Sequence, residues 1–248
     1  WIGPFFAFGS SQFIPLLSGL FFDFATIGIM SLAIGITLMS ISLLSVFDGF
    51  ALPKINENSR LTTNSQRSKI NYLLRYWHLL FSLSVLFSLL IFIFSDYIVL
   101  IIGGEEYKEA SNILKWLTIL ISLKPLSVLR TIIYTSQSTK KILYYSSIKF
   151  ILELILLYVF FALLGPLGVS FGLSVAFIFY GYLLSVHLKS VDNKFKKILR
   201  KILTSHLVVA CGLVCLTILS LQFSVGIFLA IISFVIFSFY LAPKRSKF

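Results

Sequence analysis

Apolar runs of roughly 20 residues recur along the chain, and this repetition constrains its fold more than any other feature. A helix needs about 20 residues to cross the hydrocarbon core of a bilayer. The chain is 58% hydrophobic and 12% charged. A soluble domain is about half apolar and about a quarter charged. The sequence therefore predicts an all-α integral membrane protein, built as a polytopic helical bundle.

The spacing of the runs predicts about eight transmembrane helices within one transmembrane region, residues 1–248. The expected spans are 1–22, 27–50, 74–94, 113–134, 146–164, 169–186, 203–219 and 225–241. No hydrophilic stretch between them is long enough for a soluble catalytic domain. The chain begins at Trp1 inside an apolar run, without the basic start of a signal peptide. We therefore expect a fragment of a longer protein.

The basic residues gather in alternate loops, and this pattern predicts the orientation of the chain. There are 21 Lys+Arg against 9 Asp+Glu, giving a net charge of +12. Basic clusters occupy 54–75, 140–141, 189–201 and 244–247, whereas the loops between them are neutral or acidic. Short basic loops stay in the cytoplasm, so we expect a cytoplasmic C-terminus. Because the positive charge lies in these loops, we expect no nucleic acid partner.

The sequence offers no combination of residues typical of a metal, cofactor or catalytic site. Cys211 and Cys215 lie four residues apart in an apolar run, and two thiols lack the further ligands of a zinc site. His78, His187 and His206 lie near the ends of expected spans, where interfacial positions are usual. Motifs such as HExxH, GxSxG and GxxxxGK[ST] are absent. We expect no metal ion and no catalytic residue.

Four charged residues lie deep within expected spans: Lys124, Arg130, Lys149 and Glu153. Ionisable groups inside a membrane are costly and mark functional sites. Lys149 and Glu153 are four residues apart, so they share a helix face and can pair with each other. Lys124 and Arg130 are about 240° apart on an ideal helix, so they do not form one stripe. Lys115 lies close enough to a span end to extend into the interface.

These charges suggest an anion site between helices. The short turn at 140–141 predicts that the fourth and fifth spans are neighbours, which places Arg130, Lys149 and Glu153 at similar depth. Lys124, Arg130 and Lys149 would give a cavity of net positive charge, partly offset by Glu153, and such a cavity suits a phosphate group. The alternative is a purely structural pair between Lys149 and Glu153.

Three stretches resemble a known family. They read GIMSLAIGITLMSISLLSVFDGFALPKI, IIGGEEYKEASNILKWLTI and YTSQSTKKILYYSSIKFILELILLYVFFALLGPLGVSFGLSVA. They are similar to the polysaccharide transporter group, which is O-antigen flippase-like, of the multidrug/oligosaccharidyl-lipid/polysaccharide exporter superfamily. The resemblance covers roughly residues 15–188, which is most of the chain. It implies two helical lobes, of which this chain would be the C-terminal portion.

The resemblance also implies an activity. It points to a flippase, not an enzyme, that exports an undecaprenyl-pyrophosphate-linked oligosaccharide for O-antigen or capsule biosynthesis by alternating access. The implied location is the bacterial cytoplasmic (inner) membrane. The implied partners are the lipid-linked oligosaccharide, membrane lipids, and polysaccharide polymerase or assembly proteins. The family supplies no invariant motif for Lys124, Arg130, Lys149 or Glu153, so their role is inferred from the residues alone.

Two other functions remain open from the sequence. A cation-coupled multidrug antiporter of the same superfamily predicts an acid-lined cavity, and the deep basic residues speak against it. A membrane-embedded glycosyl- or acyltransferase needs a catalytic His or acid beside a sizeable loop. The longest loop, 54–71, holds Glu57 as its one acid.

Overall fold

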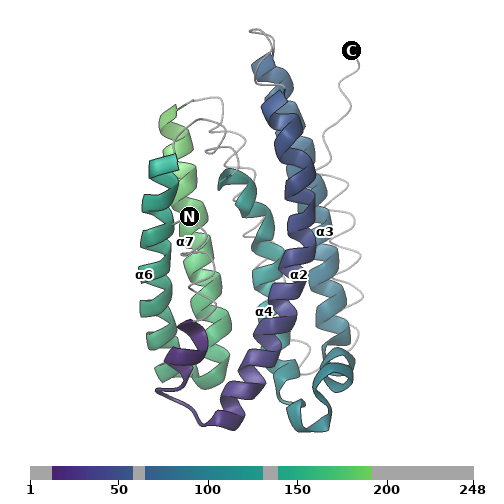
Figure 1. The fold of residues 1–248 in the computed structure, drawn as a ribbon, viewed down its shortest axis with the longest axis vertical. Coiled ribbons are helices and arrows are strands. Elements are labelled where there is room, and N and C mark those ends of the chain that lie inside the picture. Colours follow the sequence, from purple (N-terminus) through teal and green to yellow (C-terminus); the bar gives the residue numbers. More distant parts are fainter. Residues whose placement is uncertain (1–12, 58–64, 131–138, 192–248) are drawn as a thin grey trace.

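The computed structural model describes residues 13–57, 65–130 and 139–191, and these ranges contain helices and no strand (Figure 1). The five long helices are α2 (Phe24–Glu57), α3 (Ser65–Gly103), α4 (Ala110–Leu123), α6 (Thr139–Leu164) and α7 (Gly168–Val191). Three short 3-10 helices are η1 (Glu105–Tyr107), η2 (Lys124–Leu126) and η3 (Gly165–Leu167). Residues 13–18 and 127–130 are also helical. The predicted all-α fold is confirmed.

Four helical stretches are long and apolar enough to cross a membrane. They are Phe24–Phe47, Arg75–Gly103, Ala110–Arg130 and Ile142–Val186, the last of which contains both α6 and α7. These helices indicate a multi-pass membrane protein. The expected spans 203–219 and 225–241 lie outside the described residues, as do 1–12 of the first span and 131–134 of the fourth.

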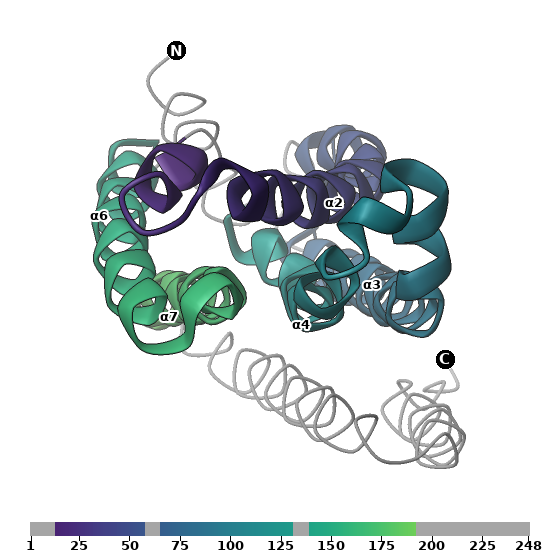
Figure 2. The same ribbon diagram turned by 90° about the horizontal axis from the view of Figure 1, so that it is seen from below.

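Helix α7 lies between α4 and α6 (Figure 2). The helices α6 and α7 form an antiparallel hairpin joined by η3, while α2, α3 and α4 pack together on the other side of α7 (Figure 1). The sequence analysis expected the fourth and fifth spans to be direct neighbours. In the structure α7 separates α4 from α6, because its own small residues let it approach both.

Glycines on α7 make these close approaches. A Cβ at Gly172 would lie 3.1 Å from the Leu157 side chain of α6, and one at Gly181 would lie 3.1 Å from the Leu126 side chain of η2. At the hairpin turn Gly165 has φ +61°, a left-handed conformation that favours glycine. Small residues at helix contacts are typical of membrane bundles, where close van der Waals packing drives association.

Several buried hydroxyl groups on α2 and α3 donate to backbone carbonyl oxygens. Thr37 donates to the carbonyl oxygen of Ala33 at 2.9 Å, and Ser40 donates to that of Ile36 at 2.8 Å. Ser88 instead donates across to the carbonyl oxygen of Thr118 at 2.8 Å, which links α3 to α4. Such bonds let polar residues occupy an apolar bundle, because a buried polar group without a hydrogen bond is costly.

Asp23 marks the start of α2. The backbone N–H of Thr26 donates to the Asp23 carboxylate at 3.2 Å. Hydrogen bonds from the side chain and the backbone of Thr26 lower the pKa of the Asp23 carboxyl. This arrangement satisfies one of the backbone donors that a helix start leaves free.

The hairpin contact gives a first prediction. A Cβ at Gly168 would overlap the backbone of Phe160, whereas a Cβ at Gly35 has nothing within 4 Å. We expect Gly168→Ala to destabilise the purified protein by about 2 kcal/mol, since α6 and α7 must separate to admit the methyl group. Gly35→Ala should be neutral or stabilising, because alanine favours helix. Thermal unfolding in detergent measures both, and equal melting temperatures would contradict the expectation.

Candidate functional site

Lys149 and Glu153 form an ion pair on one face of α6. The Lys149 Nζ donates to Glu153 Oε2 at 2.9 Å. Glu153 is only 3% exposed, and the Lys149 side chain is 19% exposed. The four-residue spacing predicts this pairing, because residues one helical turn apart face the same way. Both charges therefore lie inside the bundle, as the cost of a charge in lipid requires.

Residues of α7 contact the same part of α6. The Lys149 Nζ lies 6.0 Å from the centroid of the Phe177 ring, where a cation is attracted to the aromatic face. About one turn earlier in α6, the Ser146 and Tyr180 hydroxyl groups are 3.3 Å apart and share a hydrogen bond. The charged pair is therefore held against α7 rather than facing the bilayer.

Lys124 lies where the α4 stretch breaks. It begins η2, and its side chain is buried, with the residue 7% exposed. Its Nζ donates to the Ser127 hydroxyl oxygen at 3.2 Å. Pro125 has no backbone N–H, so the α-helical ladder is interrupted and the backbone N–H of Lys124 bonds instead to the carbonyl oxygen of Ile121. The short 3-10 helix η2 is the local consequence of this proline.

Lys124 and Lys149 lie at similar depth on opposite sides of α7. Parallel helices α4 and α7 meet at Trp116 and Phe171, whose ring centroids are 5.0 Å apart, and again at Leu126 and Gly181. In both pairs the α7 residue has the same sequence offset from its partner in the α4 stretch, so the two parallel helices keep a constant register. That register puts Lys124 level with the part of α7 near Phe177, and Phe177 is the residue that Lys149 contacts.

Arg130 is exposed and is the last residue before the undescribed segment 131–138. The structure thus brings Lys149 and Glu153 together and puts Lys124 across α7 from them. The expected cluster of Arg130, Lys149 and Glu153 was inferred from direct contact between the fourth and fifth spans. In the structure α7 lies between α4 and α6 instead.

Sequence reasoning missed an ion pair between α3 and α4. The Lys115 Nζ donates to both carboxylate oxygens of Asp96, at 3.1 and 3.0 Å. The expected span 74–94 ends before Asp96, and Lys115 was expected to extend into the interface. The missed signal is the apolar run Tyr97–Ile102, which continues α3 beyond Asp96 to Gly103. Opposite charges on the facing ends of α3 and α4 were therefore already present in the sequence.

Two hydroxyl groups of α7 are buried without a hydrogen-bond partner in the described structure: Ser170 and Ser174. They lie one turn apart, and Ser174 precedes Gly181 by two turns, so the three share a helix face. That face contacts η2 at Leu126. Nothing in the hydropathy of the sequence distinguishes these serines from the others.

Among the residues that the structure describes, no group of three or more His, Cys, Asp and Glu side chains could hold a metal ion. The candidate site consists of Lys124 of η2 together with Lys149 and Glu153 of α6. Lysine ammonium groups donate hydrogen bonds and attract anions, and Glu153 limits the net positive charge.

Residues 64–159 match the family model described as MatE. This match supports the multidrug/oligosaccharidyl-lipid/polysaccharide exporter superfamily. The matched range includes Lys124, Arg130, Lys149 and Glu153. MatE proteins are transporters and not enzymes, so the match supports a membrane exporter or flippase. No curated protein matches the chain, and no solved structure matches it.

The ion pair on α6 gives a second prediction. Removing one partner of a buried pair leaves the other charge uncompensated, so Glu153→Ala should destabilise the protein by about 3 kcal/mol. The double variant Lys149→Met with Glu153→Leu should recover most of that loss, because it removes both charges and keeps the volume. Thermal unfolding of the three proteins in detergent tests the coupling. A double variant that is no more stable than Glu153→Ala would contradict it.

Proposed function

We propose that the chain is part of a flippase that moves a lipid-linked oligosaccharide across the bacterial cytoplasmic membrane by alternating access. The carrier would be undecaprenyl pyrophosphate, and the product would serve O-antigen or capsule biosynthesis. The MatE match supports an exporter of this superfamily. The choice of substrate is our inference from the charges inside the bundle.

The observation that carries the proposal is the pair of lysines at similar depth on either side of α7. Lys124 is buried in η2, and Lys149 is mostly buried on α6. A pyrophosphate offers several anionic oxygens, and ammonium groups held away from water attract them more strongly than exposed ones do. Glu153 reduces this attraction, so that the substrate is bound but can also be released.

The break at η2 suits this role. Broken helices in transporters line substrate sites, where irregular backbone contacts a cavity rather than lipid. A 3-10 segment within a spanning helix is also a common place for bending. Lys124 begins this segment, so a change in the bend would move its ammonium group.

A cation-coupled multidrug antiporter is the second candidate, and the buried carboxylate of Glu153 is the observation that favours it. An antiporter needs an acid that can bind a cation or a proton. However, the Lys149 Nζ already lies 2.9 Å from Glu153, and this lysine would compete with a cationic drug. The anionic substrate therefore fits the described charges better.

A flipping assay tests the proposal. The full-length protein would be reconstituted into vesicles with a lipid-linked oligosaccharide, and the rate at which the substrate reaches the opposite leaflet would be measured. We expect Lys124→Ala to lower this rate about tenfold, since a charge-assisted hydrogen bond contributes about 1.5–3 kcal/mol. Arg130→Ala tests the third basic residue of the hypothesis in the same assay.

The matched control is Arg75→Ala, which removes an exposed basic residue and causes the same change in net charge. It should flip at the wild-type rate. Unchanged flipping in both Lys124→Ala and Arg130→Ala would remove these residues from the mechanism. Export of cationic dyes by the wild type, without flipping of the oligosaccharide, would favour the antiporter instead.

A further inference from the structure

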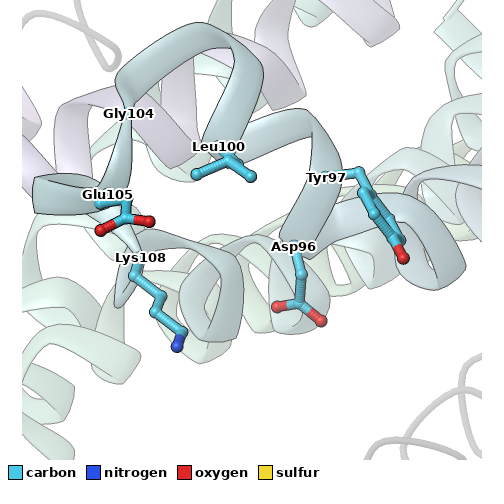
Figure 3. A pocket seen from close by; sticks show the side chains of 6 residues that line it. All are labelled: Asp96, Tyr97, Leu100, Gly104, Glu105 and Lys108. Atoms are coloured by element: carbon cyan, nitrogen blue, oxygen red, sulfur yellow. The ribbon is translucent and has the colours of Figure 1, made fainter.

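A small cavity lies at the end of α3 (Figure 3). Its volume is about 300 Å³, and six residues line it: Asp96, Tyr97, Leu100, Gly104, Glu105 and Lys108. We propose that this cavity binds the headgroup of a phospholipid that carries a primary ammonium, namely phosphatidylethanolamine. The inference does not depend on which substrate the transporter moves.

The backbone at Gly104 shapes the cavity. Gly104 has φ +80°, a conformation that glycine adopts without strain, and it turns the chain from α3 into η1. The turn brings Glu105 and Lys108 near Asp96, which lies two turns earlier in α3. In Figure 3 the Glu105 carboxylate and the Lys108 ammonium group come from one side of the cavity, and Asp96 and Tyr97 come from the other.

The charges around the cavity are balanced. Asp96 and Glu105 bring two carboxylates, and Lys108 brings one ammonium group. The second ammonium group is that of Lys115, which donates to both oxygens of Asp96. A simple anion would be repelled by both carboxylates, and a simple cation would be repelled by the Lys108 ammonium group. A zwitterion can satisfy both signs, with its phosphate at Lys108 and its ammonium at Glu105, since Asp96 is already paired with Lys115.

The surface beside the cavity is apolar and exposed. Tyr97 is 67% exposed, Leu100 is 49% exposed and Ile101 is 83% exposed. They lie near the end of the stretch Arg75–Gly103, which is long and apolar enough to cross a membrane. A ligand with its polar group in the cavity and its acyl chains along α3 would therefore cover both surfaces. Tyrosine at this level is typical of a membrane–water interface.

These features favour a lipid over a soluble zwitterion. The cavity lies at the end of a stretch that is long and apolar enough to cross a membrane, so phospholipid headgroups surround it at high local concentration, whereas a soluble zwitterion must bind from water. The cavity volume lies at the lower end of the range for small-molecule sites, which suits a headgroup alone. A primary ammonium donates hydrogen bonds to the Glu105 carboxylate in addition to the charge attraction, whereas a quaternary ammonium offers charge attraction alone, so the primary ammonium is favoured.

The test measures lipid retained by the protein. The full-length protein in detergent would be incubated with equal amounts of phosphatidylethanolamine, phosphatidylcholine and phosphatidylglycerol, and native mass spectrometry would count the bound lipid of each class. We expect phosphatidylethanolamine to be retained most. Phosphatidylcholine, whose ammonium group is fully methylated, has no N–H donor on that group, and phosphatidylglycerol has no ammonium group.

Glu105→Gln and Glu106→Gln form a matched pair for the same measurement. Both glutamates are exposed on η1, but only Glu105 lines the cavity. We expect Glu105→Gln to lower phosphatidylethanolamine retention about fivefold, the effect of about 1 kcal/mol. Glu106→Gln should retain it as the wild type does. Equal retention of the three lipids by the wild type, or equal effects of the two variants, would overturn the proposal.

Discussion

The arrangement of the bundle depends on how closely α7 approaches its two neighbours. Glycines bring its backbone against α6 at Leu157 and against η2 at Leu126. Inside a membrane there is no hydrophobic gain from covering an apolar surface that lipid already covers, so this close contact supplies much of the association energy. Larger side chains at these positions would widen both interfaces together, because α7 belongs to each of them.

This packing decides how the charged residues are distributed. Lys124 and Lys149 cannot lie side by side, since α7 stands between α4 and α6. Their similar depth instead follows from two registers, one parallel between α4 and α7 and one antiparallel between α6 and α7. The positive charge inside the bundle is thus divided between η2 and α6, on either side of α7. A ligand that meets both lysines must therefore bind between helices rather than along one of them.

The sequence predicted the helices better than it predicted their neighbours. Hydropathy indicates which segments are helical, and the spacing of Lys149 and Glu153 indicates a shared face, because both properties are local. The position of α7 is not local: a short turn between two helices limits the distance between their ends, but it does not stop a later helix from packing between them. The pair Asp96–Lys115 was missed because Asp96 interrupts an apolar run and resembles its end, although α3 continues to Gly103. Pro125, by contrast, marks η2 directly, since a missing N–H acts at its own position.

The two lysines also differ in what they are attached to. Lys149 is paired with Glu153 on the uninterrupted helix α6, so these two charges move as one unit. Lys124 begins η2, at the break in the α4 stretch. Any change in the angle at η2 therefore alters the distance between the ammonium groups of Lys124 and Lys149. An anion that contacts both favours the conformation in which they lie closest, and a ligand shifts a conformational equilibrium only through such differential contacts. If the proposed anion binds there, Lys124 would couple its binding to the bending of the spanning stretch at η2.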